Sequence, residues 1–171
     1  DFDQNMYIAG QAGVGKTHLV EKIAALNPDV HLVRIEGNMT AFFFAKQIAV
    51  QMYIAEMQNK KQIAIYMDDI NTLFSKIEMM DMFKIMMDTS KDRFSYNKGL
   101  NMGGMEDIES DAINYWKSKQ PDRVGFEVPF NGRVRFIMTP CVKVQQLINV
   151  MKCYSFYGMV GKSQMNIVFV L

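Results

Sequence analysis

The chain has few cysteines, almost no net charge and no long apolar run. Its two cysteines, Cys141 and Cys153, have neither the number nor the spacing of a disulfide framework or a zinc site. The 19 basic and 18 acidic side chains leave a formal net charge of +1, which gives no electrostatic argument for nucleic-acid binding. No apolar run approaches the ~18 residues that span a bilayer, and no secretory signal opens the sequence. We therefore expect a cytoplasmic protein in a reduced compartment, without a membrane partner.

The composition is that of a globular protein. Hydrophobic residues make up 49% of the chain and charged residues 22%, and 171 residues are enough for one core. We expect a single domain over residues 1–171. Of the sixteen methionines, five crowd residues 79–87. Such residues either fill a core, which is the commoner case, or line an adaptable partner surface.

One segment has a complete phosphate-binding motif. Residues 10–17 read Gly-Gln-Ala-Gly-Val-Gly-Lys-Thr, which satisfies G-x-x-x-x-G-K-[ST]. A short apolar run at 6–9 precedes the motif, and residues 17–26 follow it with helical spacing. Three apolar residues are expected on one side of that helix: Leu19, Ile23 and Leu26. Strand, glycine loop and helix form the context in which this motif binds phosphate.

Each part of this loop has a chemical role. Glycines let the backbone approach an anion, and the helix N-terminus presents unpaired N–H groups to it. Lys16 would reach the β- and γ-phosphates, and the Thr17 hydroxyl would ligate Mg²⁺. The alternative is a chance glycine-rich turn before a helix. The residues expected to bind the nucleotide are Gly10, Ala12, Gly13, Val14, Gly15, Lys16, Thr17 and His18.

A second segment supplies acidic groups. The apolar run at 63–67 ends in Asp68 and Asp69, which a parallel strand would carry to the same sheet edge as the loop. Asp68 would hold Mg²⁺ through water, and Asp69 would act as general base towards the attacking water. The alternative is a polar strand end that caps the next helix. Combined with the loop, the pair predicts a Mg²⁺-ATP hydrolysis centre.

Thr139 follows the fourth expected strand, at 133–138. If that strand lies between the first and the third, Thr139 would face the γ-phosphate and help to orient the lytic water. The alternative is a threonine that merely leaves a strand before Pro140.

Strands and helices alternate along most of the sequence, which predicts an α/β fold with a mostly parallel sheet and helices on both faces. The expected strands are 6–9, 30–35, 62–67, 133–138 and 165–171, and the expected helices are 17–26, 41–58, 71–88 and 142–151. Asn38 or Thr40 is expected to cap the helix at 41–58. Residues 91–130 break this alternation and predict an insertion with a helix at 106–119, either functional or a plain surface excursion.

The chain resembles the AAA+ family of P-loop ATPases. The matching pieces are Gly10–Thr17 as Walker A, Ile63–Asp69 as Walker B and Phe136–Thr139 as the sensor 1 strand. The resemblance implies a three-layer αβα core with a five-stranded sheet in the order 5-1-4-3-2. It also implies ATP and Mg²⁺ as cofactors, and homo-oligomeric rings or helices with sites at subunit contacts. Lys16, Asp69 and Thr139 would be the catalytic residues.

Several departures from the family pattern narrow this interpretation. Walker B usually ends in Asp-Glu, and the double aspartate here resembles helicase loaders, which favours a loader or clamp-loader-like motor in DNA replication, perhaps from a phage. Superfamily-3 viral helicases share the double aspartate but need Asn where Thr139 stands.

No arginine follows Arg135, so Lys162 stands where the arginine finger is expected. The Gly-Lys-Ser at 161–163 precedes a strand and is interpreted as a turn. The helical lid beyond the fifth strand is expected to be absent after Leu171.

Three functions remain open from the sequence. The first is a motor or loader that couples ATP hydrolysis to the remodelling of a macromolecular client, either nucleic acid or protein. The second is a nucleotide-dependent scaffold or switch with little hydrolysis. The third, ranked last, is a small-molecule kinase, which usually needs several arginines around the transferred group; the chain has five.

Overall fold

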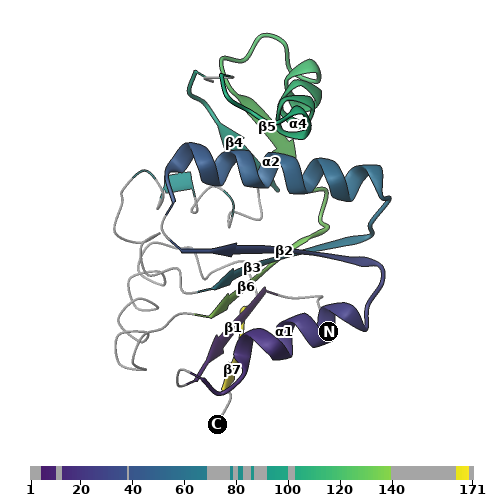
Figure 1. Ribbon diagram of the computed structural model, residues 1–171, viewed down its shortest axis with the longest axis vertical. Helices are drawn as coiled ribbons and strands as arrows, with labels where there is room; N and C mark the ends of the chain where they lie inside the picture. The colour runs from purple at the N-terminus through teal and green to yellow at the C-terminus, as the bar shows by residue number, and fades with distance from the viewer. Residues whose placement is uncertain are drawn as a thin grey trace.

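A computed structural model gives the arrangement of most of the chain (Figure 1). It describes residues 5–10, 13–37, 39–68, 78, 81–82, 86, 92–99, 103–139 and 165–169. The helices and strands are β1 (Asn5–Ala9), α1 (Lys16–Ala25), β2 (Val30–Glu36), α2 (Ala41–Met57), β3 (Gln62–Asp68), β4 (Arg93–Tyr96), α4 (Asp107–Ser118), β5 (Phe126–Pro129), β6 (Val134–Thr139) and β7 (Met165–Phe169).

Five of the strands form the main sheet, in the order β2-β3-β6-β1-β7, and every neighbouring pair is parallel. Strand β6 therefore lies between β1 and β3. The register pairs Asp68 at the end of β3 with Thr139 at the end of β6. Because all five strands run the same way, their carboxyl ends share one edge of the sheet, and the expected α/β class with a parallel sheet is confirmed.

The side chains of β3 alternate between two cores. Ile63, Ile65 and Met67 belong to the larger core, together with the buried residues of α2. Ala64 and Tyr66 belong to a smaller core that includes Val20 of α1. Helices α1 and α2 thus cover opposite faces of the sheet (Figure 1), and residues of even number on β3 face α1.

The apolar side of α1 differs from the one expected. Leu19 is 37% exposed and Leu26 is 74% exposed, whereas Val20 is buried and Ile23 is partly buried against the smaller core. Leu26 follows the last helical residue as the C-cap, so it is not on the packed face. The prediction of Leu19 and Leu26 as packed residues was wrong because Val20, Ile23 and Ala24, at spacings of three and four, form the buried stripe.

Helix α2 begins at a capping threonine. The Thr40 side chain accepts a hydrogen bond from the Phe43 N–H at 3.2 Å, which satisfies one of the unpaired donors of the first turn. Of the two expected caps, Thr40 is the one observed, and Asn38 lies outside the described residues.

Strands β4 and β5 pair antiparallel and, with α4, form a unit that lies on the far side of α2 from the main sheet (Figure 1). The Trp116 indole N–H of α4 donates to the Ala49 carbonyl of α2 at 2.8 Å. Lys46 of α2 and Glu109 of α4 form an ion pair at 2.6 Å. This β4–α4–β5 unit shares the larger core with α2 and the sheet.

Several expected features fall outside the described residues. They are most of the helix at 71–88, the helix at 142–151, the segment that contains Lys162, and both cysteines. Met82 and Met86 are described and are buried in the larger core, which supports a core role for these two methionines. Among the described residues, no helix is long and apolar enough to span a membrane.

Candidate functional site

The loop after β1 has the backbone of a phosphate-binding turn. Gly13 and Gly15 have φ angles of 82° and 86°, in the left-handed region that favours glycine. No described atom lies within 4 Å of a Cβ built at either position. Gly15 is also the N-cap of α1, and its carbonyl accepts from the Leu19 N–H at 2.9 Å. The glycines therefore set the turn that leads directly into the N-terminus of α1.

Lys16 and Thr17 are the first two residues of α1. The Lys16 ammonium donates to the Gly10 carbonyl at 2.9 Å, so the side chain lies back over the loop. The Thr17 hydroxyl donates to Asp68 Oδ2 at 2.8 Å, across 51 residues of sequence. The loop and the end of β3 are thus in direct contact, as the two motifs predict.

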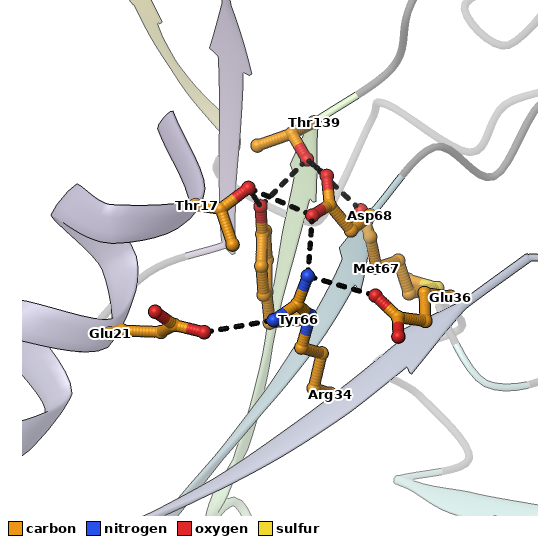
Figure 2. A network of polar contacts seen from close by, with 8 residues as sticks. All are labelled: Thr17, Glu21, Arg34, Glu36, Tyr66, Met67, Asp68 and Thr139. Atoms are coloured by element: carbon orange, nitrogen blue, oxygen red, sulfur yellow. Dashed lines mark hydrogen bonds and ion pairs between the residues drawn. The ribbon is translucent and has the colours of Figure 1, made fainter. Parts of the chain in front are cut away.

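Asp68 receives a second hydroxyl on its other oxygen. Thr139 Oγ1 donates to Asp68 Oδ1 at 2.7 Å, and Thr139 is fully buried (Figure 2). The register of β3 and β6 produces this contact because it places the two residues side by side at the strand ends. Both oxygens of one carboxylate are therefore occupied by threonine hydroxyls from two different elements.

Tyr66 joins the two threonines. Its hydroxyl lies 3.1 Å from Thr17 Oγ1 and 3.1 Å from Thr139 Oγ1. It stands two residues before Asp68 on β3, so both side chains lie on the α1 face of the sheet. Figure 2 shows Thr17, Tyr66, Asp68 and Thr139 converging at the carboxyl ends of the strands.

Arg34 of β2 is the cation beside this cluster. Its guanidinium contacts Glu21 of α1 at 2.9 Å, Glu36 at 2.8 Å and Asp68 at 3.4 Å (Figure 2). One guanidinium is thus shared by three carboxylates, and Asp68 has the longest of the three contacts. Within this group of described side chains, three carboxylates therefore face one guanidinium.

The environment of Asp68 favours its ionised form. Burial alone would raise the pKa of this carboxyl, but hydrogen bonds from Thr139, Thr17 and Tyr66, with the charge of Arg34, outweigh it and lower the pKa. Burial of the Tyr66 hydroxyl raises its pKa, and its bonds to the two threonines offset only part of that rise. At neutral pH the cluster therefore contains a carboxylate and a protonated phenol.

The residues present fit a nucleotide with Mg²⁺. Within the part of the chain that the structure describes, no group of three or more His, Cys, Asp or Glu side chains could hold a metal ion alone. A hydroxyl beside a carboxylate suits a hard cation that takes its remaining ligands from phosphate oxygens and water. The open loop glycines and the negative charge around Asp68 agree with this donor set.

Of the residues predicted from the motifs, Gly10, Gly13, Val14, Gly15, Lys16, Thr17 and His18 lie on the loop and the first turn of α1, and Asp68 and Thr139 lie at the strand ends. Thr17, Asp68 and Thr139 are in contact. Ala12 and Asp69 lie outside the described residues.

Sequence analysis missed Tyr66 and Arg34. Tyr66 sits inside an apolar run, where it was counted as a strand residue only. Its spacing of two from Asp68, which puts both on one face of a strand, was the available signal.

A family model places this fold and site in a known class. The model of the ATPase family associated with various cellular activities (AAA) matches residues 6–139, which is well over half of the chain. The chain therefore belongs to the AAA family, and this membership implies a P-loop αβα fold and nucleotide binding. No curated protein matches the chain significantly.

Proposed function

We propose that this protein binds Mg²⁺-ATP at the carboxyl edge of the main sheet and hydrolyses it. The observation that carries the proposal is the contact of Asp68 with both Thr17 and Thr139, at 2.8 Å and 2.7 Å. It joins a phosphate loop, an acidic strand end and a polar residue of the intervening strand at one point. The strand order, which is the one that the resemblance to AAA+ proteins implies, also supports it.

In this proposal each residue has one role. The loop N–H groups and Lys16 bind the phosphates, and Lys16 leaves the Gly10 carbonyl to do so. Thr17 supplies a direct ligand for the cation, and Asp68 orients that ligand and the cation's water. When bound, Mg²⁺ would neutralise charge on the phosphate oxygens. Asp69 would act as the general base, and Thr139 would orient the attacking water.

We further propose that turnover drives the remodelling of a macromolecular client, as in AAA+ motors and loaders. The double aspartate of Walker B supports a helicase-loader or clamp-loader-like role in DNA replication, by analogy alone. We also propose a homo-oligomer, in which a neighbouring subunit would complete the site, as the resemblance to AAA+ proteins implies.

The Lys16→Ala variant tests the proposal. Because charge-assisted hydrogen bonds to phosphate are lost, nucleotide should bind about 10- to 100-fold more weakly, and phosphate release should fall to background. Lys119→Ala is the matched control, since Lys119 contacts Glu56 and Tyr115 on the other side of the molecule. If wild-type protein binds nucleotide but releases no phosphate, alone or with DNA, the hydrolytic part of the proposal is wrong.

One observation favours a second candidate, a nucleotide-dependent switch with little hydrolysis. The Thr17 and Thr139 hydroxyl hydrogens both point to Asp68, so neither is available to a lytic water in this arrangement. A protein that holds this arrangement with ATP bound would change its assembly without turnover. Sizing the protein with ATP and with ADP, alongside a phosphate-release assay, separates the two candidates.

A further inference from the structure

Tyr66 has a hydroxyl that its packing does not require. The side chain is fully buried among the apolar residues of the smaller core, beneath α1. A phenylalanine would fill the same space, and a buried hydroxyl is costly unless it is hydrogen-bonded. The two threonine contacts satisfy it, and both threonines belong to the candidate nucleotide site. The hydroxyl therefore connects the core of the sheet to that site.

The hydrogen atoms in this cluster can be assigned one by one. Thr17 and Thr139 each have a single hydroxyl hydrogen. Each donates it to a different oxygen of Asp68, at 2.8 Å and 2.7 Å, and the Met67 carbonyl is a more distant acceptor for Thr139 at 3.5 Å. As a carboxylate, Asp68 has no hydrogen to give back. The Tyr66 hydroxyl is therefore the donor in this cluster. Its one hydrogen is shared between the two threonine oxygens, each 3.1 Å away, and the Asp68 carboxylate, which also accepts from Tyr66.

This assignment fixes the orientation of Thr17. A hydroxyl oxygen has two lone pairs, and in Thr17 one of them faces the Tyr66 hydrogen while the hydroxyl hydrogen faces Asp68. The second lone pair of the Thr17 oxygen is left, and the hydrogen bonds with Tyr66 and Asp68 fix its direction. Without Tyr66, the Thr17 hydroxyl would have one fewer partner to hold that direction.

We propose that Tyr66 is a positioning residue of the nucleotide site, whose hydroxyl aims a Thr17 lone pair at the divalent cation and couples Thr17 to Thr139. This inference rests on the proposed binding of Mg²⁺-nucleotide. A cation bound to Thr17 would make its oxygen a poorer acceptor, and the Tyr66 hydrogen would then favour Thr139. Tyr66 thereby transmits the state of the cation site to the residue proposed to orient the water.

The test compares Tyr66→Phe with wild-type protein in equilibrium binding of ADP, with and without Mg²⁺, so that turnover plays no part. The variant keeps the ring and removes only the shared hydrogen bond. We expect the Mg²⁺ concentration for half-maximal binding to rise about three- to tenfold. ADP affinity in EDTA should not change. Mn²⁺ in place of Mg²⁺, followed by its paramagnetic signal, measures the same shift directly.

Tyr115→Phe is the matched control, because its hydroxyl also donates to a carboxylate, Glu56, at 2.9 Å. It should bind Mg²⁺ and ADP as wild-type protein does. A Tyr66→Phe variant with unchanged Mg²⁺ dependence, or with ADP affinity reduced equally in EDTA, would overturn the inference. If wild-type protein binds no nucleotide, the proposed function fails first and the inference falls with it.

Thr139→Val supplies a second, independent variant. It removes one acceptor of the Tyr66 hydrogen, so the combined Tyr66→Phe, Thr139→Val variant should shift the Mg²⁺ dependence by less than the product of the two single shifts. Independent, multiplicative shifts would contradict the coupling between the two threonines.

Discussion

Two carboxylates of this protein sit in hydrogen-bonded networks with a tyrosine, yet their surroundings differ. Asp68, at the end of β3, contacts the hydroxyls of Thr17 and Thr139, with Tyr66 between them. Glu56, near the end of α2, accepts from Tyr115 at 2.9 Å, and contacts Arg133 at 3.1 Å and Lys119 at 3.4 Å. The first carboxylate is held mainly by neutral donors and the second mainly by cations.

The charges around the two carboxylates distinguish a binding site from a structural contact. Around Glu56 two cations face one carboxylate, so the network is electrostatically complete and ties α4 and β6 to α2. Around Asp68 one guanidinium is divided among three carboxylates. An ionised group that is hydrogen-bonded but short of positive charge is suited to receive a cation. The comparison therefore assigns cation binding to the Asp68 network and structural support to the Glu56 network.

The largest effect is expected from Asp68→Asn. The amide removes the negative charge and cannot accept a hydrogen bond through its nitrogen, so Thr17 and Thr139 lose a common acceptor. Mg²⁺-dependent nucleotide binding and turnover should fall about 10- to 100-fold, whereas the free energy of unfolding should fall by only about 1 kcal/mol. Titration calorimetry and denaturant unfolding measure the two quantities, and a large loss of stability with normal Mg²⁺ dependence would reverse the assignment.

Trp116→Phe tests whether the β4–α4–β5 unit supports the core without serving the site. The variant loses the hydrogen bond to the Ala49 carbonyl and part of a fully buried ring. The free energy of unfolding should fall by about 1–3 kcal/mol. Nucleotide affinity in folded protein should stay at the wild-type value. A variant that is stable but weak in nucleotide binding would show that the unit acts on the site.

Glu56→Gln is the counterpart of the Asp68 variant in the structural network. Arg133 is about a quarter exposed and would lose its charged partner, so the free energy of unfolding should fall by about 1–2 kcal/mol. Mg²⁺-nucleotide binding should not change. Equal losses of stability and of Mg²⁺ dependence would mean that the two networks are not distinct.

The smallest effect is expected in the acid dependence of stability. Burial raises the pKa of Glu56, but its hydrogen bonds from Tyr115 and Arg133 and the charge of Lys119 lower it more, as happens for Asp68. A lowered pKa in the folded protein stabilises above the ordinary value, 4.5 for Glu56 and 3.8 for Asp68, and this stabilisation is lost as pH falls through the folded value. Unfolding free energy should therefore be level from about pH 7 to about pH 5 and decline below that.

Glu56→Gln and Asp68→Asn should each make this acid decline shallower. An unchanged decline in both variants would show that other carboxylates cause it.

Contiguous motifs made much of the site predictable from sequence. The glycine loop, Lys16 and Thr17 are neighbours in the chain, and an apolar strand points to Asp68 by its pattern alone. Thr139 needed one further assumption, that its strand lies beside β3, which the sheet satisfies. The order of strands and helices in the described part of the sheet followed from the same alternation.

Contacts that depend on register and on the third dimension were not predictable in this way. Tyr66 looks like one more apolar residue of β3, and only the approach of α1 brings Thr17 to its hydroxyl. Arg34 acts because β2 pairs with β3 in the register that sets Glu36 beside Asp68. The misplaced face of α1 has the same origin, since helical spacing alone predicted Leu19 on the packed side, whereas packing against the sheet buries Val20.

Titration of ATP into the wild-type protein, in Mg²⁺ and again in EDTA, tests the central claim most directly. If the Asp68 network is a cation site beside a phosphate loop, ATP binds at one site per chain, and binds more tightly in Mg²⁺ than in EDTA. Absence of binding, or equal affinity in both buffers, would contradict it.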